Sequence, residues 1–348
     1  NALQESKLIL PRVKTDVADG SMKIGILMAT LLLALVSEVF GAGLPAHGVA
    51  PSGTYKQLMN VRVGGFRRSY LVHVPEGYDG TATLPLVVVL HGAFSTASKM
   101  EKQTGFSQLA DREGFLVAYP NGIGLFSLLR HWNSGHCCGR ARKKAIDDVG
   151  FVAGVIEEVA GSLRVDKTRI YLVGHSNGGM LVHRFAAEKA EVVAAIAPIS
   201  ATIGGRPSAE EPEWRVPTPG APVPVLSIHG RADEHVPYQG GHGEHSHGTI
   251  QTISVQDSLE LWVENNECET APSSELLYQG RVVRQVWTDC VRDTEVVLYT
   301  LEDWGHDWPG GPFFETLAPD DPLRAFDAAE TIWDFLQQHR RWSPRLSR

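Results

Sequence analysis

The sequence predicts an α/β protein in which helices cover both faces of a mostly parallel sheet. From about residue 55 onward, short runs of apolar and β-branched residues alternate with segments of helical spacing. Such alternation of strands and helices is typical of a parallel sheet. Residues 86–90 are apolar at every position, which is expected for a strand buried on both faces.

The predicted elements follow one another along the chain. Strands are expected at residues 68–74, 86–90, 115–119, 170–173, 192–199, 223–228 and 296–301. Helices are expected at residues 149–163, 180–189, 254–265 and 325–339. Residues 204–224 are rich in proline and glycine, and residues 239–248 are rich in glycine and histidine. We predict that both stretches are loops over the mouth of a site, because the loops of such sheets carry function.

The start of the chain has the pattern of a targeting segment. Met22 is the first methionine, and Lys23, an apolar run at residues 24–36 and small residues at 41–43 follow it. This order is typical of a secretory signal peptide, and the run is short for a membrane span, although a retained anchor is the alternative. We expect residues 1–21 to lie upstream of the true start, residues 22–43 to be a signal peptide, and residues 44–348 to form one catalytic domain. The mature chain would be extracellular or periplasmic, without stable membrane insertion.

The charge of the chain gives no sign of a nucleic-acid partner. The formal net charge is -8, and the basic stretches at residues 140–144 and 340–348 are short. Short charge runs are usually solvated surface. The sequence does not fix the oligomeric state.

The strongest local motif is Gly174-His175-Ser176-Asn177-Gly178. It lies between a predicted strand and a predicted helix, as a nucleophile elbow does, where a strained turn presents the serine hydroxyl at the edge of the sheet. Glycines stand two positions before and two positions after the serine, because larger side chains at these positions would clash within the sharp turn. A G-x-S-x-G motif alone would arise by chance in a chain with 35 glycines. In this setting it predicts the α/β-hydrolase fold, with Ser176 as nucleophile.

A serine hydroxyl is a weak nucleophile without a base. In this fold an acid and then a histidine follow the serine along the chain. Asp233 follows the strand predicted at residues 223–228, and His306 follows the strand predicted at residues 296–301. We predict that His306 is the base and that Asp233 orients it and stabilises the imidazolium. The alternative for His306 is a surface histidine. Asp148 is interpreted as a helix cap.

The same fold places one donor for an oxyanion after an early core strand and the other directly after the nucleophile. The first position is Ala93, in the sequence Leu90-His91-Gly92-Ala93, and the second is Asn177. We predict that their backbone N–H groups hold the oxyanion. His91 is interpreted as a structural residue.

The four cysteines suggest disulfides, because an even number is common in exported proteins. Cys268 and Cys290 flank a predicted hairpin, so we pair them. This leaves the adjacent Cys137 and Cys138, whose bond would close a strained eight-membered ring, and the sequence leaves open whether they pair. A zinc site would need spacers between the cysteines that this pattern lacks.

Several aromatic and histidine residues are candidates for ligand binding. We predict that Trp132, Trp304 and Trp308 contact substrate, because pockets favour aromatic walls, with core packing as the alternative. Histidine-rich tracts bind metals adventitiously. We predict no functional metal site among these histidines: His229, His235, His242, His245 and His247.

Several stretches together resemble the secreted polyhydroxybutyrate depolymerase and feruloyl esterase group of α/β-hydrolases, from about residue 65 to 339. The matching stretches are residues 85–92, 132–133, 137–138, 147–151, 169–179, 229–238 and 305–311. The resemblance implies a triad at Ser176, Asp233 and His306, no cofactor, and an ester substrate of the hydroxyalkanoate or hydroxycinnamoyl (feruloyl) type. Two features depart from the group: Trp304 stands where a glycine is usual, and a histidine-rich insert follows Tyr238.

Three alternative functions remain open at this point. A serine peptidase would prefer amides to esters. An acyltransferase would pass the acyl group to an added alcohol. A non-catalytic binding module of the same fold would not react with a fluorophosphonate, but the complete motif set disfavours it.

Overall fold

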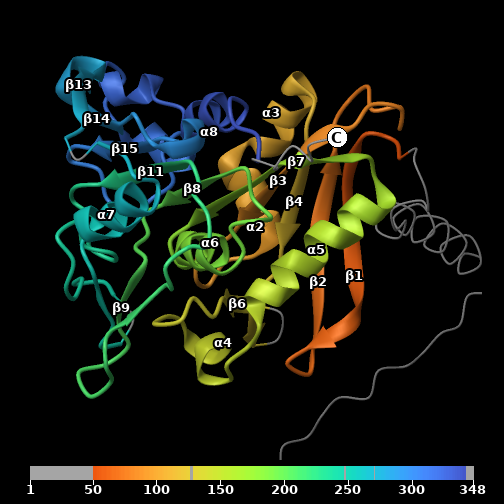
Figure 1. The fold of residues 1–348 in the computed structure, drawn as a ribbon, viewed down its shortest axis with the longest axis horizontal. Coiled ribbons are helices and arrows are strands. Elements are labelled where there is room, and N and C mark those ends of the chain that lie inside the picture. The colour runs from red at the N-terminus through yellow and green to blue at the C-terminus, as the bar shows by residue number, and fades with distance from the viewer. Residues whose placement is uncertain (1–49, 126–127, 247, 270, 342–348) are drawn as a thin grey trace, which may run out of the picture. The chain divides into compact units, whose positions relative to one another are not determined.

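A ten-stranded sheet forms the centre of the computed structural model, which describes residues 50–125, 128–246, 248–269 and 271–341 (Figure 1). The strand order is β1-β2-β4-β3-β7-β8-β11-β15-β14-β13. The six central strands from β4 to β15 pair in parallel, and the outer strands pair antiparallel. The bounds are Gly53–Val63 (β1), Phe66–Val74 (β2), Leu84–Leu90 (β3), Leu116–Pro120 (β4), Val165–His175 (β7), Ala195–Ile199 (β8), Val225–Gly230 (β11), Ser273–Leu277 (β13), Val282–Trp287 (β14) and Val296–Leu301 (β15).

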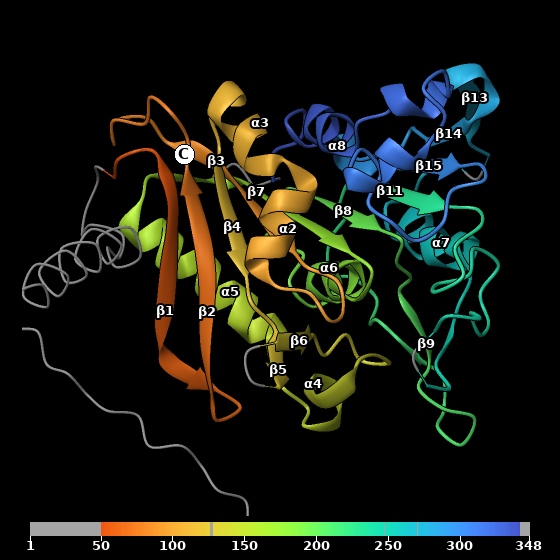
Figure 2. The same cartoon turned by 180° about the vertical axis from the view of Figure 1, so that it is seen from behind.

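Helices pack on both faces of this sheet, as Figures 1 and 2 show from opposite sides. On one face lie α5, α6 and α7, and on the other lie α2, α3 and α8. Alternate residues of β3 enter the two cores: Val88 belongs to the first and Val87 to the second. The predicted fold class is therefore confirmed. The bounds are Ala97–Thr104 (α2), Phe106–Glu113 (α3), Gly139–Lys143 (α4), Asp148–Ser162 (α5), Asn177–Glu188 (α6), Val255–Asn265 (α7) and Ala328–Leu336 (α8).

Smaller elements lie outside the central sheet. The two stretches predicted as loops contribute to, or adjoin, a three-stranded sheet in the order β10-β9-β12. The stretch from residue 204 to 224 is thus partly strand, because its backbone pairs with residues 251–252. The bounds of the small strands are Ile123–Leu125 (β5), Leu128–His131 (β6), Gly204–Arg206 (β9), Trp214–Arg215 (β10) and Gln251–Thr252 (β12); short 3-10 turns lie at Tyr278–Gly280, Val291–Asp293, Pro312–Thr316 and Pro322–Ala325.

The cap of α5 is Asp147 and not Asp148. The Asp147 side chain accepts a hydrogen bond from the Gly150 N–H at 2.7 Å. Asp148 is fully buried and forms an ion pair with Arg68 of β2 at 2.7 Å. Its other carboxylate oxygen accepts from the Asn133 N–H at 2.8 Å. The interpretation of Asp148 as a cap is therefore wrong: its negative charge is held by a buried arginine.

A disulfide joins Cys268 to Cys290 across the antiparallel hairpin of β13 and β14. Every helix within residues 50–125, 128–246, 248–269 and 271–341 is too short or too polar to span a membrane. The predicted signal peptide at residues 22–43, the segment before it and the alternative anchor all lie outside the described residues.

Candidate active site

Ser176 occupies the sharp turn between β7 and α6. Its φ angle is 55°, in the left-handed region that residues other than glycine rarely adopt and that often marks functional sites. The turn is tight because a Cβ on Gly174 would lie 2.5 Å from the Gly178 oxygen. A Cβ on Gly178 would overlap the carbonyl oxygens of Leu90 and His91. The two glycines thus have the steric role that the sequence predicts, and the structure has the geometry of a nucleophile elbow.

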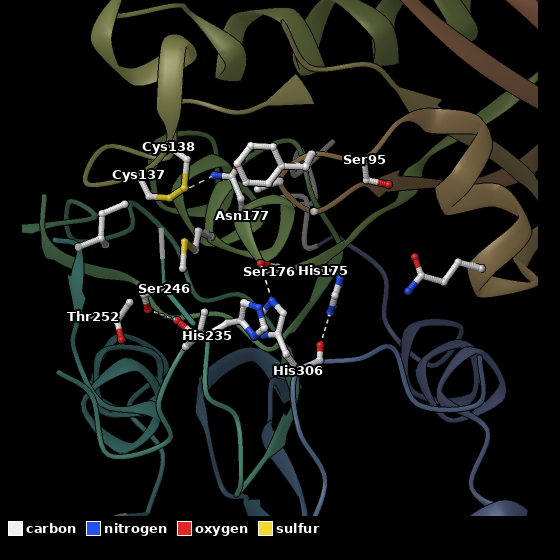
Figure 3. A pocket seen from close by; sticks show the side chains of 17 residues that line it. Ser95, Cys137, Cys138, His175, Ser176, Asn177, His235, Ser246, Thr252 and His306 are labelled. Carbon is white, nitrogen blue, oxygen red and sulfur yellow. Dashed lines mark hydrogen bonds between the residues drawn. A yellow bond between two sulfur atoms is a disulfide. The ribbon is translucent and has the colours of Figure 1, made fainter. Parts of the chain in front are cut away.

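The three residues predicted as a triad form a continuous chain of hydrogen bonds. His306 Nε2 lies 2.8 Å from Ser176 Oγ, and His306 Nδ1 lies 2.7 Å from Asp233 Oδ2. Figure 3 shows the His306 ring directed at Ser176. Because a carboxylate only accepts, Nδ1 carries the proton, and Nε2 is left to accept from the serine hydroxyl. This is the arrangement that a general base requires.

Asp233 is held in a charged form. Its side chain is fully buried, and Oδ1 accepts hydrogen bonds from the N–H groups of His235 and Val236, each at 2.8 Å. Burial alone would raise the pKa of Asp233, but the hydrogen bond and charge of His306 outweigh burial and lower the pKa below its usual value. The carboxylate therefore stays ionised at neutral pH, as is required of the acid that orients the base.

The loops that carry Asp233 and His306 are tied to each other. They follow the neighbouring parallel strands β11 and β15. The Ala232 N–H donates to the Trp304 oxygen at 3.0 Å. Gly230 permits this approach, since a Cβ there would overlap the same Trp304 oxygen. The two residues are thus held together by backbone contacts as well as by their own hydrogen bond.

Both predicted oxyanion residues lie at the wall of the same cavity as Ser176. Asn177 is the first residue of α6, and the first N–H groups of a helix have no acceptor within it. Ala93 follows Gly92, where a Cβ would lie 3.4 Å from the Ser176 Cβ. The Gly92 loop therefore packs directly against the turn that carries the nucleophile.

His91 lies beneath the site and not in it. Nε2 accepts from the Gly122 N–H at 3.0 Å, and Nδ1 lies 2.7 Å from the Gly92 oxygen. Burial lowers the pKa of His91 to about 3, so the ring is neutral and bridges two backbone segments. This supports its interpretation as a structural residue.

The three tryptophans are not at the cavity wall. Trp132, Trp304 and Trp308 are 0%, 7% and 1% exposed, and none of them lines the cavity. The Trp132 Nε1–H donates to the His91 oxygen at 2.7 Å, and the Trp304 Nε1–H donates to the Asp307 oxygen at 2.8 Å. Trp308 packs edge-on against His175. The prediction of substrate contact is therefore wrong for this structure, because these side chains fill the core that supports the site.

The cavity around Ser176 has a volume of about 350 Å³. Its lining residues are Gly92, Ala93, Phe94, Ser95, Gln103, Cys137, Cys138, His175, Ser176, Asn177, Met180, His235, Val236, Ser246, Ile250, Thr252 and His306 (Figure 3). No aspartate, glutamate, lysine or arginine is among these described lining residues. Sequence reasoning missed Met180, although it lies one helical turn after Ser176 and therefore on the same side of α6.

The Cys137–Cys138 pair and one of the candidate metal-binding histidines, His235, also line the cavity. Cys137 and Cys138 are bonded to each other and line its wall. His235 stacks on His306 with ring centroids 4.6 Å apart. Asp233, His235 and His306 are the one group of potential metal ligands that lie close together in the described ranges, and two of them are already hydrogen-bonded within the triad. His247 lies outside the described residues.

The chain is similar in sequence to known esterases. Residues 68–212 match the family model described as Esterase PHB depolymerase. The chain is 28% identical over 290 residues to a protein of Nocardia uniformis subsp. tsuyamanensis that is named as an esterase (NocK), covering 79% of this chain and 81% of the relative. It is 28% identical over 240 residues to feruloyl esterase B of Piromyces equi, covering 69% of this chain but only 42% of that longer protein.

A solved structure, the acetyl xylan esterase from Aspergillus awamori, superposes with a TM-score of 0.51 at 15% identity, covering 73% of this chain and 94% of that one. At this identity the likeness concerns the fold alone. The fold, the site geometry and the sequence relatives lead to one assignment. The chain is a carboxylic ester hydrolase of the α/β-hydrolase fold, similar to the polyhydroxybutyrate depolymerase and feruloyl esterase group.

Proposed function

We propose that this chain is a secreted serine esterase that acts through an acyl-enzyme, with Ser176 as nucleophile, His306 as base and Asp233 as the orienting acid. The observation that carries the proposal is the chain of hydrogen bonds from Ser176 Oγ through His306 to Asp233, at 2.8 and 2.7 Å. Secretion is supported by the pattern of residues 22–43 and by the disulfides, which persist in oxidising compartments.

The proposed reaction has two halves. His306 Nε2 takes the hydroxyl proton while Ser176 Oγ attacks the ester carbonyl carbon. The N–H groups of Ala93 and Asn177 stabilise the negative oxygen of the tetrahedral intermediate, and losing one such donor typically costs a hundredfold or more in rate. His306 then gives its proton to the leaving alcohol oxygen, and the acyl group stays on Ser176. Water, deprotonated by His306, releases the acid and restores the serine.

The proposed substrates are uncharged esters of hydroxyalkanoic or hydroxycinnamic acids. The described lining of the cavity carries no acidic side chain, lysine or arginine, so an ionic acyl group would be desolvated there without a partner. The matched relatives are named for polyhydroxybutyrate depolymerisation and feruloyl ester hydrolysis. A single cavity next to the serine serves an ester of either acid.

The test is a set of initial rates of the mature chain on methyl ferulate, a hydroxybutyrate oligomer, and p-nitrophenyl acetate and butyrate. The proposal predicts hydrolysis of the nitrophenyl esters and preference for either the ferulate or the oligomer, with turnover abolished in Ser176→Ala. The matching amides should react far more slowly. Equal or faster cleavage of amides would contradict an esterase, and acyl transfer to an added alcohol in place of hydrolysis would indicate an acyltransferase.

A further inference from the structure

A small apolar cluster lies beside the nucleophile, separate from the two large cores of the sheet. It consists of Cys137, Met180, Ala201 and Val236, with Cys138 and Ile250 packed against it. All of these except Ala201 line the cavity. We call the five lining residues the sulfur wall: Cys137, Cys138, Met180, Val236 and Ile250.

The sulfur wall is joined to the oxyanion side of the site. Met180 lies one turn after Ser176, and its backbone N–H donates to the backbone carbonyl oxygen of Ser176 at 2.9 Å. Asn177 Nδ2 lies 3.9 Å from Cys137 Sγ. Figure 3 shows Ser176 between the Cys137–Cys138 pair on one side and His306 on the other. The cysteine pair and the base therefore lie in different directions from the nucleophile.

The chemistry of the proposed reaction gives these directions different roles. The leaving oxygen must receive its proton from His306 Nε2, so the alcohol part of the ester lies on the His306 side. The acyl chain is the other substituent of the same carbonyl carbon, and it extends away from the leaving oxygen. In this cavity that direction leads to the Cys137–Cys138 pair of the sulfur wall (Figure 3).

We propose that the sulfur wall is the acyl subsite, that it takes an uncharged apolar acyl chain, and that Met180 limits the length of the chain it accepts. This inference rests on the proposed function. The wall is built from thioether, disulfide and aliphatic carbon, and the Met180 side chain is 4% exposed. The polar side chains of the cavity lining belong to residues outside the wall, among them Ser246 and Thr252 (Figure 3).

The experiment compares two substitutions of Met180 that have opposite effects on the space in the acyl subsite. Met180→Ala lengthens the subsite and Met180→Phe fills it. The matched control is Met100→Ala, which removes a fully buried methionine from α2, in a core on the other side of the sheet and away from the cavity wall. The readout is kcat/KM for p-nitrophenyl esters from acetate to octanoate, and for acetates of methanol to octanol.

One methylene in an apolar pocket changes specificity by about tenfold or more. We expect Met180→Ala to raise the octanoate-to-butyrate ratio of kcat/KM by about tenfold, and Met180→Phe to lower it by a similar factor. The alcohol series should not change, and Met100→Ala should keep the acyl profile of the parent. A variant that merely weakens the fold would lower all rates together.

Unchanged acyl profiles in both folded Met180 variants would overturn the proposal, and so would a shift confined to the alcohol series. Labelling by a fluorophosphonate separates this failure from failure of the proposed function. If the parent chain is labelled at Ser176 while the profiles stay unchanged, only the acyl subsite is wrong. If Ser176 is not labelled, the proposed function itself is wrong.

Discussion

The side chain of Asn177 holds the backbone of Trp132 by two hydrogen bonds. Oδ1 accepts from the Trp132 N–H at 2.7 Å, and Nδ2 donates to the Trp132 oxygen at 3.1 Å. The Asn177 backbone N–H is one of the two proposed oxyanion donors. The residue therefore fixes its own position against the segment that leads to Cys137 and Cys138.

Replacing Asn177 by Asp should lower kcat and leave KM nearly unchanged. Aspartate has no amide hydrogens, so its carboxylate would face the Trp132 oxygen and the oxyanion donor would shift. We expect a loss of about ten- to a hundredfold, smaller than the loss on removing a donor outright because the N–H is displaced and not removed, measured by steady-state kinetics. Asn266 holds the Val223 backbone by the same pair of bonds, at 3.0 and 2.8 Å. Asn266→Asp is thus a matched control, and an equal fall in kcat there would refute the positioning role.

Replacing Asp148 by Asn should destabilise the protein strongly. The pair with Arg68 is fully buried, with side chains 0% and 1% exposed. Removing one partner of a buried ion pair costs about 3–5 kcal/mol, because the other charge is left without compensation. The loss is measured by urea denaturation. Glu330→Gln breaks the exposed pair with Arg112 and should cost under about 1 kcal/mol; similar losses in the two variants would argue against a special role for burial.

Stability should fall as the pH falls from about 6.5 to 3, and His183 should account for one proton of this dependence. Burial lowers the pKa of His183 to about 3, whereas an unfolded histidine titrates near 6.5. Between these values the unfolded chain binds the additional proton, so acid favours unfolding. In the parent chain the Trp262 Nε1–H donates to His183 Nδ1 at 3.0 Å. The variant His183→Asn keeps an acceptor for this N–H in the asparagine side-chain oxygen. The variant should reduce the slope of unfolding free energy by about 1.4 kcal/mol per pH unit in that window, and an unchanged slope would count against a neutral buried His183.

Removing the Cys268–Cys290 disulfide should affect stability but not catalysis. The two residues are 22 positions apart, and closing a loop of this size stabilises by about 3 kcal/mol in the chain-entropy account. The double variant Cys268→Ala, Cys290→Ala should lose about that amount of unfolding free energy in urea. Its kcat on p-nitrophenyl butyrate should match the parent chain, because Cys290 follows Trp287, which pairs with Val296 at the start of β15, whereas His306 follows the opposite end of that strand. A loss of kcat in the folded variant would contradict this prediction, because it would show that the disulfide affects the catalytic site.

The sequence predicts the parts of this protein whose signals are local. Continuous apolar runs locate the buried central strands, and the Gly174–Gly178 spacing locates the elbow. The edge strand β1 escaped prediction because its alternation of polar and apolar residues breaks where the polar pair Lys56-Gln57 meets the apolar pair Leu58-Met59. Asp147 and Asp148 are adjacent and identical in type, so only the packing of Arg68 decides which of them is the cap.

The walls of the cavity could not be read in the same way. Aromatic side chains are placed by the layers of the fold, and Trp132, Trp304 and Trp308 belong to the two cores of the sheet. Met180 follows β7, Val236 follows β11, and Ile250 precedes β12 of the small sheet, so only the topology of the fold brings these three segments together. No single-sequence pattern contains that information.

The central claim is that Ser176 becomes acylated during ester hydrolysis. The most direct test is mass spectrometry of the chain quenched during turnover of p-nitrophenyl butyrate, followed by peptide mapping. The account predicts one butyryl group on the peptide that contains Ser176, no such adduct in Ser176→Ala, and at least about a thousandfold loss of kcat in that variant. A butyryl group on another residue, or turnover that survives in Ser176→Ala, would contradict it.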